Sequence, residues 1–112
     1  MRKIEKAMLD AMTRGQDFSR DNTTVYWYTD ADDERYCEVR LHGNRIAEYH
    51  PSRSEVYATD AGWQTATTKS RLNAILDTLV GIRLYQHDFE WFFNIEAVRH
   101  HWSGNQYFST KQ

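Results

Sequence analysis

The spacing of hydrophobic residues begins with a helical period and then changes to a strand-like one. Between Arg2 and Arg14 the apolar residues recur at helical spacing, with charged residues on the other faces, which predicts an amphipathic helix. Gly15 follows directly, and glycine commonly ends a helix. From Thr23 to Thr59, short runs rich in Val, Tyr, Trp and Thr alternate with turn residues, which is typical of antiparallel strands.

The strand-like region divides into four predicted strands with connections short enough for consecutive hairpins. These strands are Thr23–Thr29, Arg35–Leu41, Arg45–His50 and Glu55–Thr59. In the second strand, Cys37, Val39 and Leu41 alternate with polar or aromatic residues, so one face is expected to be buried and the other wet. Cys37 is therefore predicted to lie in the core as a small apolar side chain.

A second helix is predicted from Thr67 to Leu79, because its leucine and isoleucine residues form one apolar stripe and Gly81 follows. Thr65 or Thr67 is expected to cap its first turn through the side-chain oxygen.

The last third of the chain gives weaker signals. Strands are predicted at Ile82–Gln86 and Phe89–Asn94, with Phe89, Trp91 and Phe93 on one face and a turn or bulge at His87–Asp88. Beyond them, Ile95, Val98 and Trp102 could line a short helix, and Gln106–Gln112 is either a final strand or a frayed end.

This order predicts one α+β domain over residues 1–112. Its expected architecture is a four-to-six-stranded antiparallel sheet with two helices on one face, in the order α-β-β-β-β-α-β with an optional last strand. The 112-residue length suits a single core, and no repeat or linker divides it.

Composition narrows the chemistry. The net charge of -2 provides no overall basic field for nucleic acid. A single cysteine excludes an internal disulfide and a cysteine-rich zinc or iron–sulfur site, and the five histidines show no metal-ligand spacing, so no metal or cofactor is predicted. With no membrane-spanning run and no signal-peptide core, the expected location is the cytoplasm.

Four stretches of the sequence together point to a known family. They are Lys3–Ala11 (KIEKAMLDA), Leu41–Tyr49 (LHGNRIAEY), Gly62–Gln64 leading into Thr67–Leu76 (TTKSRLNAIL), and Asp88–Phe92. They resemble a family of small accessory proteins of tailed bacteriophages, over roughly Arg2 to Phe93. The resemblance implies a protein made in the bacterial cytoplasm that binds host machinery or defence systems, and it carries over no catalytic residue. Residues 95–112 are expected to form a less ordered or member-specific C-terminal extension.

The start of the second predicted helix is one candidate site. Thr67, Thr68, Lys69, Ser70 and Arg71 place hydroxyls and two cations where the helix dipole favours anions, which predicts a site for an anionic group of a partner. Alternatively, the two cations pair with acids such as Asp60 or Glu55. In exposed ion pairs, that would contribute about 1 kcal/mol or less to stability.

The aromatic residues suggest a second candidate site. The sequence holds 7 Tyr, 5 Phe and 4 Trp, more than a core of this size is expected to bury, so some should form an exposed face. The predicted members of that interaction face are Tyr26, Tyr28, Tyr36, Tyr49, Tyr57, Phe92, Arg40 and Arg45. The opposing interpretation is that the first helix and the C-terminal segment cover these residues as a second core layer.

The function that these observations favour is non-enzymatic. The chain is predicted to bind and inhibit a bacterial host or anti-phage defence component, and its aromatic face could also join copies into an oligomer. The alternative is a small nucleic-acid-binding module in which exposed tyrosines stack bases between arginines. A small enzyme is disfavoured, since no set of nucleophile, base and orienting group is recognisable.

Overall fold

The computed structural model describes residues 1–111, which form two helices and nine strands. The helices are α1 (Lys3–Arg14) and α2 (Ala66–Leu79), with a short 3₁₀ turn, η1, at Pro51–Arg53. The strands are β1 (Phe18–Arg20), β2 (Thr23–Thr29), β3 (Arg35–Leu41), β4 (Asn44–His50), β5 (Glu55–Thr59), β6 (Tyr85–His87), β7 (Glu90–Ile95), β8 (Val98–His101) and β9 (Asn105–Ser109).

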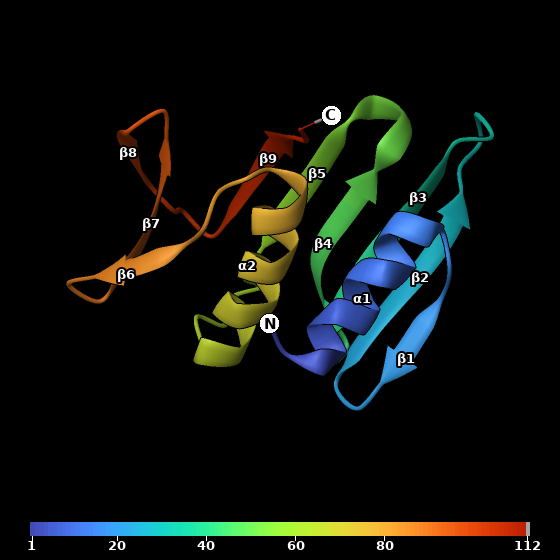
Figure 1. The fold of residues 1–112 in the computed structure, drawn as a ribbon, viewed down its shortest axis with the longest axis horizontal. Coiled ribbons are helices and arrows are strands. Elements are labelled where there is room, and N and C mark those ends of the chain that lie inside the picture. Colours follow the sequence, from blue (N-terminus) through green and yellow to red (C-terminus); the bar gives the residue numbers. More distant parts are fainter. Residues whose placement is uncertain (112) are drawn as a thin grey trace.

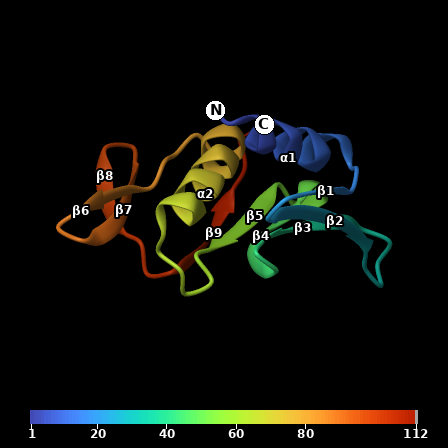
Figure 2. The ribbon, with the colours of Figure 1, turned by 90° about the horizontal axis from the view of Figure 1, so that it is seen from below.

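Six strands form the main sheet, in the order β1-β2-β3-β4-β5-β9, and each pairs with its neighbour in antiparallel fashion. Both helices lie on one face of this sheet, and β6, β7 and β8 form a separate three-stranded sheet at one end of the molecule (Figures 1 and 2). Within residues 1–111, no α-helix lies over the opposite face of the six-stranded sheet (Figure 2). We call this surface the outer face.

The core lies between the helices and the sheet. Met8 and Met12 of α1 and Leu72, Ile75 and Leu76 of α2 are fully or almost fully buried, as their helical spacing requires. They belong to the same core cluster as the inward-facing sheet residues Val25, Cys37, Val39 and Val56. Burying each large aliphatic side chain contributes roughly 1.5–3 kcal/mol. This packing therefore fixes which face of the sheet is left for other molecules.

The three-stranded sheet is anchored by aromatic packing. Trp91, Phe93 and Trp102 are buried, and the Phe93 ring meets the Phe108 ring of β9 edge-on, with the ring centroids 5.3 Å apart. The side chain of Asn73 in α2 adds a two-way contact with the backbone of Leu84, donating at 3.0 Å and accepting at 2.6 Å. The small sheet is thus fixed to both α2 and β9.

The predicted α+β class and the helix-first order are confirmed, with a six-stranded antiparallel sheet and both helices on one face. The strands at Thr23–Thr29, Arg35–Leu41 and Glu55–Thr59 match their predicted bounds. The three-residue β1 is too short to show a period, so the sequence pattern does not predict it. Neither helix within residues 1–111 is long and apolar enough to span a membrane.

Several predictions for the last third of the chain need correction. The short helix considered near Val98 is wrong, because Val98–His101 forms β8. Phe89 does not share the buried face of Trp91 and Phe93; it lies in the turn before β7 and is 91% exposed. The final strand, one of two alternatives for Gln106–Gln112, is present as Asn105–Ser109, and Gln112 lies outside the described residues.

Candidate interaction surfaces

Helix α2 begins with a side-chain cap. The Thr65 hydroxyl oxygen accepts a hydrogen bond from the Thr68 backbone N–H at 3.1 Å, so Thr65 rather than Thr67 is the capping residue. The two hydroxyls of Thr65 and Thr68 also lie 2.9 Å apart. This local bonding sets the direction of the residues that follow in the first turns of the helix.

Arg71 points into the protein instead of toward solvent. Only 4% of its side chain is exposed, and its Nη1 donates to Glu5 Oε2 of α1 at 2.8 Å. Its Nε donates to the Thr23 hydroxyl at 3.0 Å, and its Nη2 donates to Asn22 at 3.3 Å. The suggested pairing of this cation with Asp60 or Glu55 is therefore wrong. The helices pack side by side, which brings Glu5 to Arg71 although the two residues are 66 positions apart.

The other predicted anion-site residues separate into two directions. Ser70 Oγ donates to Glu5 Oε2 at 2.6 Å, so Ser70 joins the buried ion pair. Lys69 Nζ lies 5.8 Å from the centroid of the Trp91 ring, toward the small sheet. Thr67 and Thr68 line a cavity on the sheet side of the helix start. The structure thus does not gather the predicted residues around one anion.

The outer face carries most of the predicted aromatic surface. Tyr28 stacks on Tyr36 with centroids 5.4 Å apart, and Tyr36 stacks on His50 at 4.9 Å. In the next row, Tyr57 lies 4.7 Å from Tyr107. Tyr26 is also on this face, 45% exposed, because it pairs with Glu38 and alternates with the buried Val25. The aromatic rings are therefore arranged in two rows across several strands.

Two predicted members of the aromatic face lie elsewhere. Tyr49 pairs with Cys37 and Val56, whose side chains are buried, so Tyr49 faces the helices, where it packs against the core. Burial raises the pKa of its phenol. Phe92 belongs to β7 in the three-stranded sheet and packs near Tyr85 and His101. The sequence could not separate these cases, since strand parity relative to the core depends on register.

The alternative in which α1 and the C-terminal segment cover the aromatic residues holds for Tyr49, which faces the helices, but not for the residues of the outer face. Helix α1 packs on the opposite face of the sheet, and the C-terminal segment adds β9 at the edge instead of crossing the sheet (Figure 2). β9 in fact extends the outer face, because its Tyr107 pairs with Tyr57 and is 63% exposed.

Two arginines on the outer face pair with carboxylates. Arg40 binds Glu38 at 2.8 Å, and Arg45 binds Glu48 at 2.7 Å. The Arg45 guanidinium also lies 5.2 Å from the centroid of the Tyr57 ring. Near one edge, Arg53 lies 3.6 Å from Glu34. Each of these three arginines therefore has a carboxylate beside it, and Arg45 also contacts an aromatic ring.

Glu48 lies at the centre of this charge network. It accepts from Arg45 and lies 2.7 Å from His50 Nε2, which is itself almost buried. Partial burial favours the protonated carboxyl, but the hydrogen bonds from His50 and Arg45 outweigh it and lower the Glu48 pKa. The pKa of Tyr36 is raised by burial and by the nearby Glu48 carboxylate. The folded surface thus favours the ionised form of Glu48.

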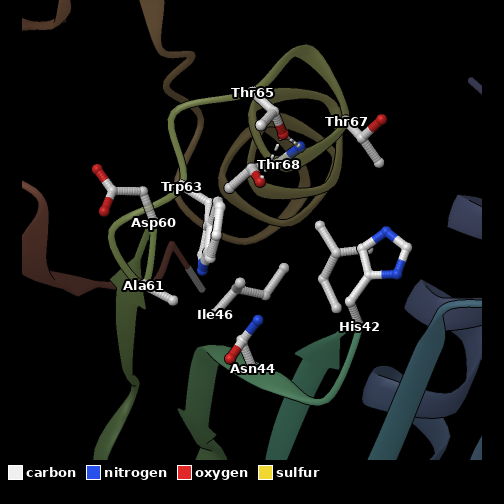
Figure 3. A pocket seen from close by; sticks show the side chains of 10 residues that line it. His42, Asn44, Ile46, Asp60, Ala61, Trp63, Thr65, Thr67 and Thr68 are labelled. Atoms are coloured by element: carbon white, nitrogen blue, oxygen red, sulfur yellow. Dashed lines mark hydrogen bonds between the residues drawn. The ribbon is translucent and has the colours of Figure 1, made fainter.

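A cavity of about 390 Å³ opens between the start of α2 and the β3–β4 turn. Its floor includes the buried side chains of Leu41 and Ile46, and Trp63 and His42 lie on opposite sides of it (Figure 3). The sequence analysis did not single out Trp63 or His42 as a pair. In the sequence, each residue stands next to a glycine in a turn, Trp63 after Gly62 and His42 before Gly43. The two turns are far apart in the sequence, so nothing there indicates that the residues line one cavity.

The remaining candidate groups are the Cys37 thiol and the side chains that could bind a metal ion. Burial raises the pKa of the Cys37 thiol to about 12, so at neutral pH it is a protonated core residue, as predicted. Within residues 1–111 there is no group of three or more His, Cys, Asp or Glu side chains placed to hold a metal ion.

A family model described as Kyanoviridae Gp96 protein matches residues 1–112, which is the whole chain. Searches of curated proteins and of solved structures find no match for this chain.

Proposed function

We propose, from the premise that the chain belongs to the Kyanoviridae Gp96 protein family of phage proteins, that it is a non-enzymatic accessory protein. It acts in the bacterial host cytoplasm by binding and inhibiting a host or anti-phage defence protein. The outer face of the six-stranded sheet is the surface that binds this partner.

The observation that carries the proposal is the ordered aromatic surface with paired arginines. Tyrosine and arginine are the residues most enriched where protein interfaces concentrate their binding energy. Tyr28, Tyr36 and His50 form one stack, so these side chains already have fixed positions before a partner arrives. Less side-chain entropy is then lost on binding, which favours affinity.

The same surface argues against nucleic acid as the partner. Stacking proteins for single strands combine aromatic rings with cations that follow the phosphate backbone. Here Arg40 and Arg45 already bind Glu38 and Glu48, and these carboxylates would repel phosphates. A protein partner with its own polar and aromatic groups fits this mixed charge better than a polyanion.

The test is affinity purification of the tagged protein from infected host cells, comparing the parent with a Tyr26→Ala, Tyr28→Ala variant. Both side chains are at least 40% exposed, so the double change should leave the fold intact. The matched control is Tyr85→Ala, which removes a tyrosine of similar exposure, 37%, from the small sheet.

We expect a host protein that is retained by the parent and the control, resists nuclease treatment, and is lost by the double variant. Direct binding of the purified partner to each variant then measures the contribution of the outer face. Equal retention by all three forms would remove the outer face as the binding surface. Loss of the retained material after nuclease treatment would instead support the nucleic-acid alternative.

A further inference from the structure

The cavity at the start of α2 is separate from the outer face and has the features of a small-ligand site. Its volume of about 390 Å³ is within the usual range for pockets that enclose small organic molecules. The Leu41 and Ile46 side chains in its lining are 4% and 1% exposed, so the floor is apolar and fixed by the core. Trp63 and His42 provide two flat rings on opposite sides of the opening (Figure 3).

The loop that carries Trp63 is held by buried Asp60. Asp60 is 5% exposed. Its carboxylate accepts hydrogen bonds from Gly62 N–H at 2.8 Å, Gln64 Nε2 at 3.1 Å and Trp102 Nε1 at 3.0 Å. Its backbone oxygen accepts from Trp63 N–H at 2.9 Å. Four contacts thus fix the loop, yet the Trp63 side chain itself remains 61% exposed. The Trp63 ring is therefore held beside the cavity, where a ligand that enters can stack on it.

The charges around the cavity restrict the ligand. Among the described residues that line it there is no lysine or arginine, and Lys69 and Arg71 of the same helix point to Trp91 and Glu5. The carboxylate in the lining is that of Asp60, and its oxygens already accept from three donors. An anionic ligand would find no cationic lysine or arginine side chain here, only the backbone N–H groups of the α2 start, and a cationic one would have to share a carboxylate that already accepts three hydrogen bonds.

The polar groups at the rim suit a ring with a hydrogen-bonding edge. The Asn44 amide and the Thr67 hydroxyl can both donate and accept, and within residues 1–111 neither side chain makes a hydrogen bond. A neutral, planar heterocycle could place one face against the Trp63 ring and its edge against Asn44 or Thr67. Bases stack on aromatic side chains in this manner in proteins that bind them.

We propose that this cavity binds the base of a nucleoside, with Trp63 as the main stacking residue. The proposal is independent of the outer face, and it assigns the uncharged nucleoside as the ligand in preference to a nucleotide or a nucleic-acid strand.

The experiment uses the full chain and four probes, adenosine, guanosine, cytidine and uridine, measured by ligand-observed saturation-transfer NMR. We expect at least one nucleoside to bind saturably with a Kd of about 1 mM or tighter. Its 5′-monophosphate should bind more weakly, because the phosphate finds no cation at the cavity. Trp63→Ala should weaken the binding by about tenfold or more, and Trp63→Phe should retain it within about threefold, since a ring is kept.

Two controls separate a local effect from a general one. Phe89→Ala removes another exposed aromatic side chain that does not line this cavity, and it should bind the nucleoside like the parent. Thermal melting of each variant establishes that it is folded. Absence of saturable binding of all four nucleosides up to about 5 mM would overturn the proposal. Equal binding by Trp63→Ala, or tighter binding of the monophosphate than of the nucleoside, would do the same.

Discussion

Removing one partner of the buried ion pair between Glu5 and Arg71 should strongly reduce the free energy of unfolding. Each side chain is 4% exposed, and Arg71 also donates to Thr23 and Asn22. Removing one partner of such a pair typically costs about 3–5 kcal/mol, because the other charge stays buried without compensation. For Arg71→Met, the Glu5 carboxylate would keep only the hydrogen bond from Ser70.

This magnitude is large against the stability of a small domain, which is about 5–15 kcal/mol. For a chain of this size a loss of about 3–5 kcal/mol lowers the melting temperature by roughly 10–20 °C. From the sequence, pairing with nearby acids was the alternative to an anion site, and as an exposed pair it would contribute about 1 kcal/mol or less, so the two values differ several-fold. Urea denaturation followed by circular dichroism measures the difference directly.

The exposed pair between Arg83 and Asp77, 3.7 Å apart, provides the matched control. Arg83→Met should cost about 0–1 kcal/mol, because both side chains are more than half exposed and solvent screens them. A double Glu5→Leu, Arg71→Met variant removes both buried charges and should recover part of the loss of either single change. If Arg71→Met costs no more than Arg83→Met, the buried pair does not contribute to holding α1 against α2.

Three further predictions use other parts of the molecule. At neutral pH, Cys37 should not react with a water-soluble disulfide reagent until the protein unfolds, because burial raises its pKa to about 12 and closes access; rapid reaction of the native protein would contradict this. Because the pKa of Glu48 is lowered in the folded protein, the stabilisation by its carboxylate is complete at pH values above 4.5, the ordinary pKa of Glu, and is lost as the pH falls through the folded-state pKa. Glu48→Gln should therefore flatten the acid side of a curve of unfolding free energy against pH. Self-association through the outer face predicts a mass above 13.3 kDa by light scattering at micromolar concentration, returning toward the monomer mass in the Tyr26→Ala, Tyr28→Ala variant.

The strands and helices with strong periodicity could be predicted from the sequence because each buries one face. In β3, the alternation that ends at Leu41 fixed both its bounds and the burial of Cys37. The register of β4 could not be obtained in the same way. A bulge between Val39 and Arg40 in the β3–β4 pairing leaves Ile46 and Ala47 both buried, so simple alternation fails there and Tyr49 was assigned to the wrong face.

The candidate sites were harder to predict, because each depends on contacts between distant segments. Arg71 appeared to be a surface cation at a helix start, and only the packing of α1 beside α2 reveals Glu5 as its partner. The sequence pattern drew attention to the start of α2 but could not show which of its residues face a cavity. Thr67 and Thr68 line that cavity, whereas the two cations that drew attention to the region point elsewhere.

The outer face and the cavity at the start of α2 differ in their charges, so each suits a different kind of ligand. On the outer face, cations are present but lie beside carboxylates, so binding requires a partner that can satisfy both signs at once. At the cavity, the described lining offers no lysine or arginine, and the ligand must gain its affinity from stacking on Trp63 and from contact with the apolar floor of Leu41 and Ile46. Since the outer face lies on the side of the sheet away from the helices and the cavity lies at the start of α2, occupation of one leaves the other accessible. Variants of Tyr26 and Tyr28 should therefore leave nucleoside binding unchanged, and Trp63→Ala should leave partner retention unchanged.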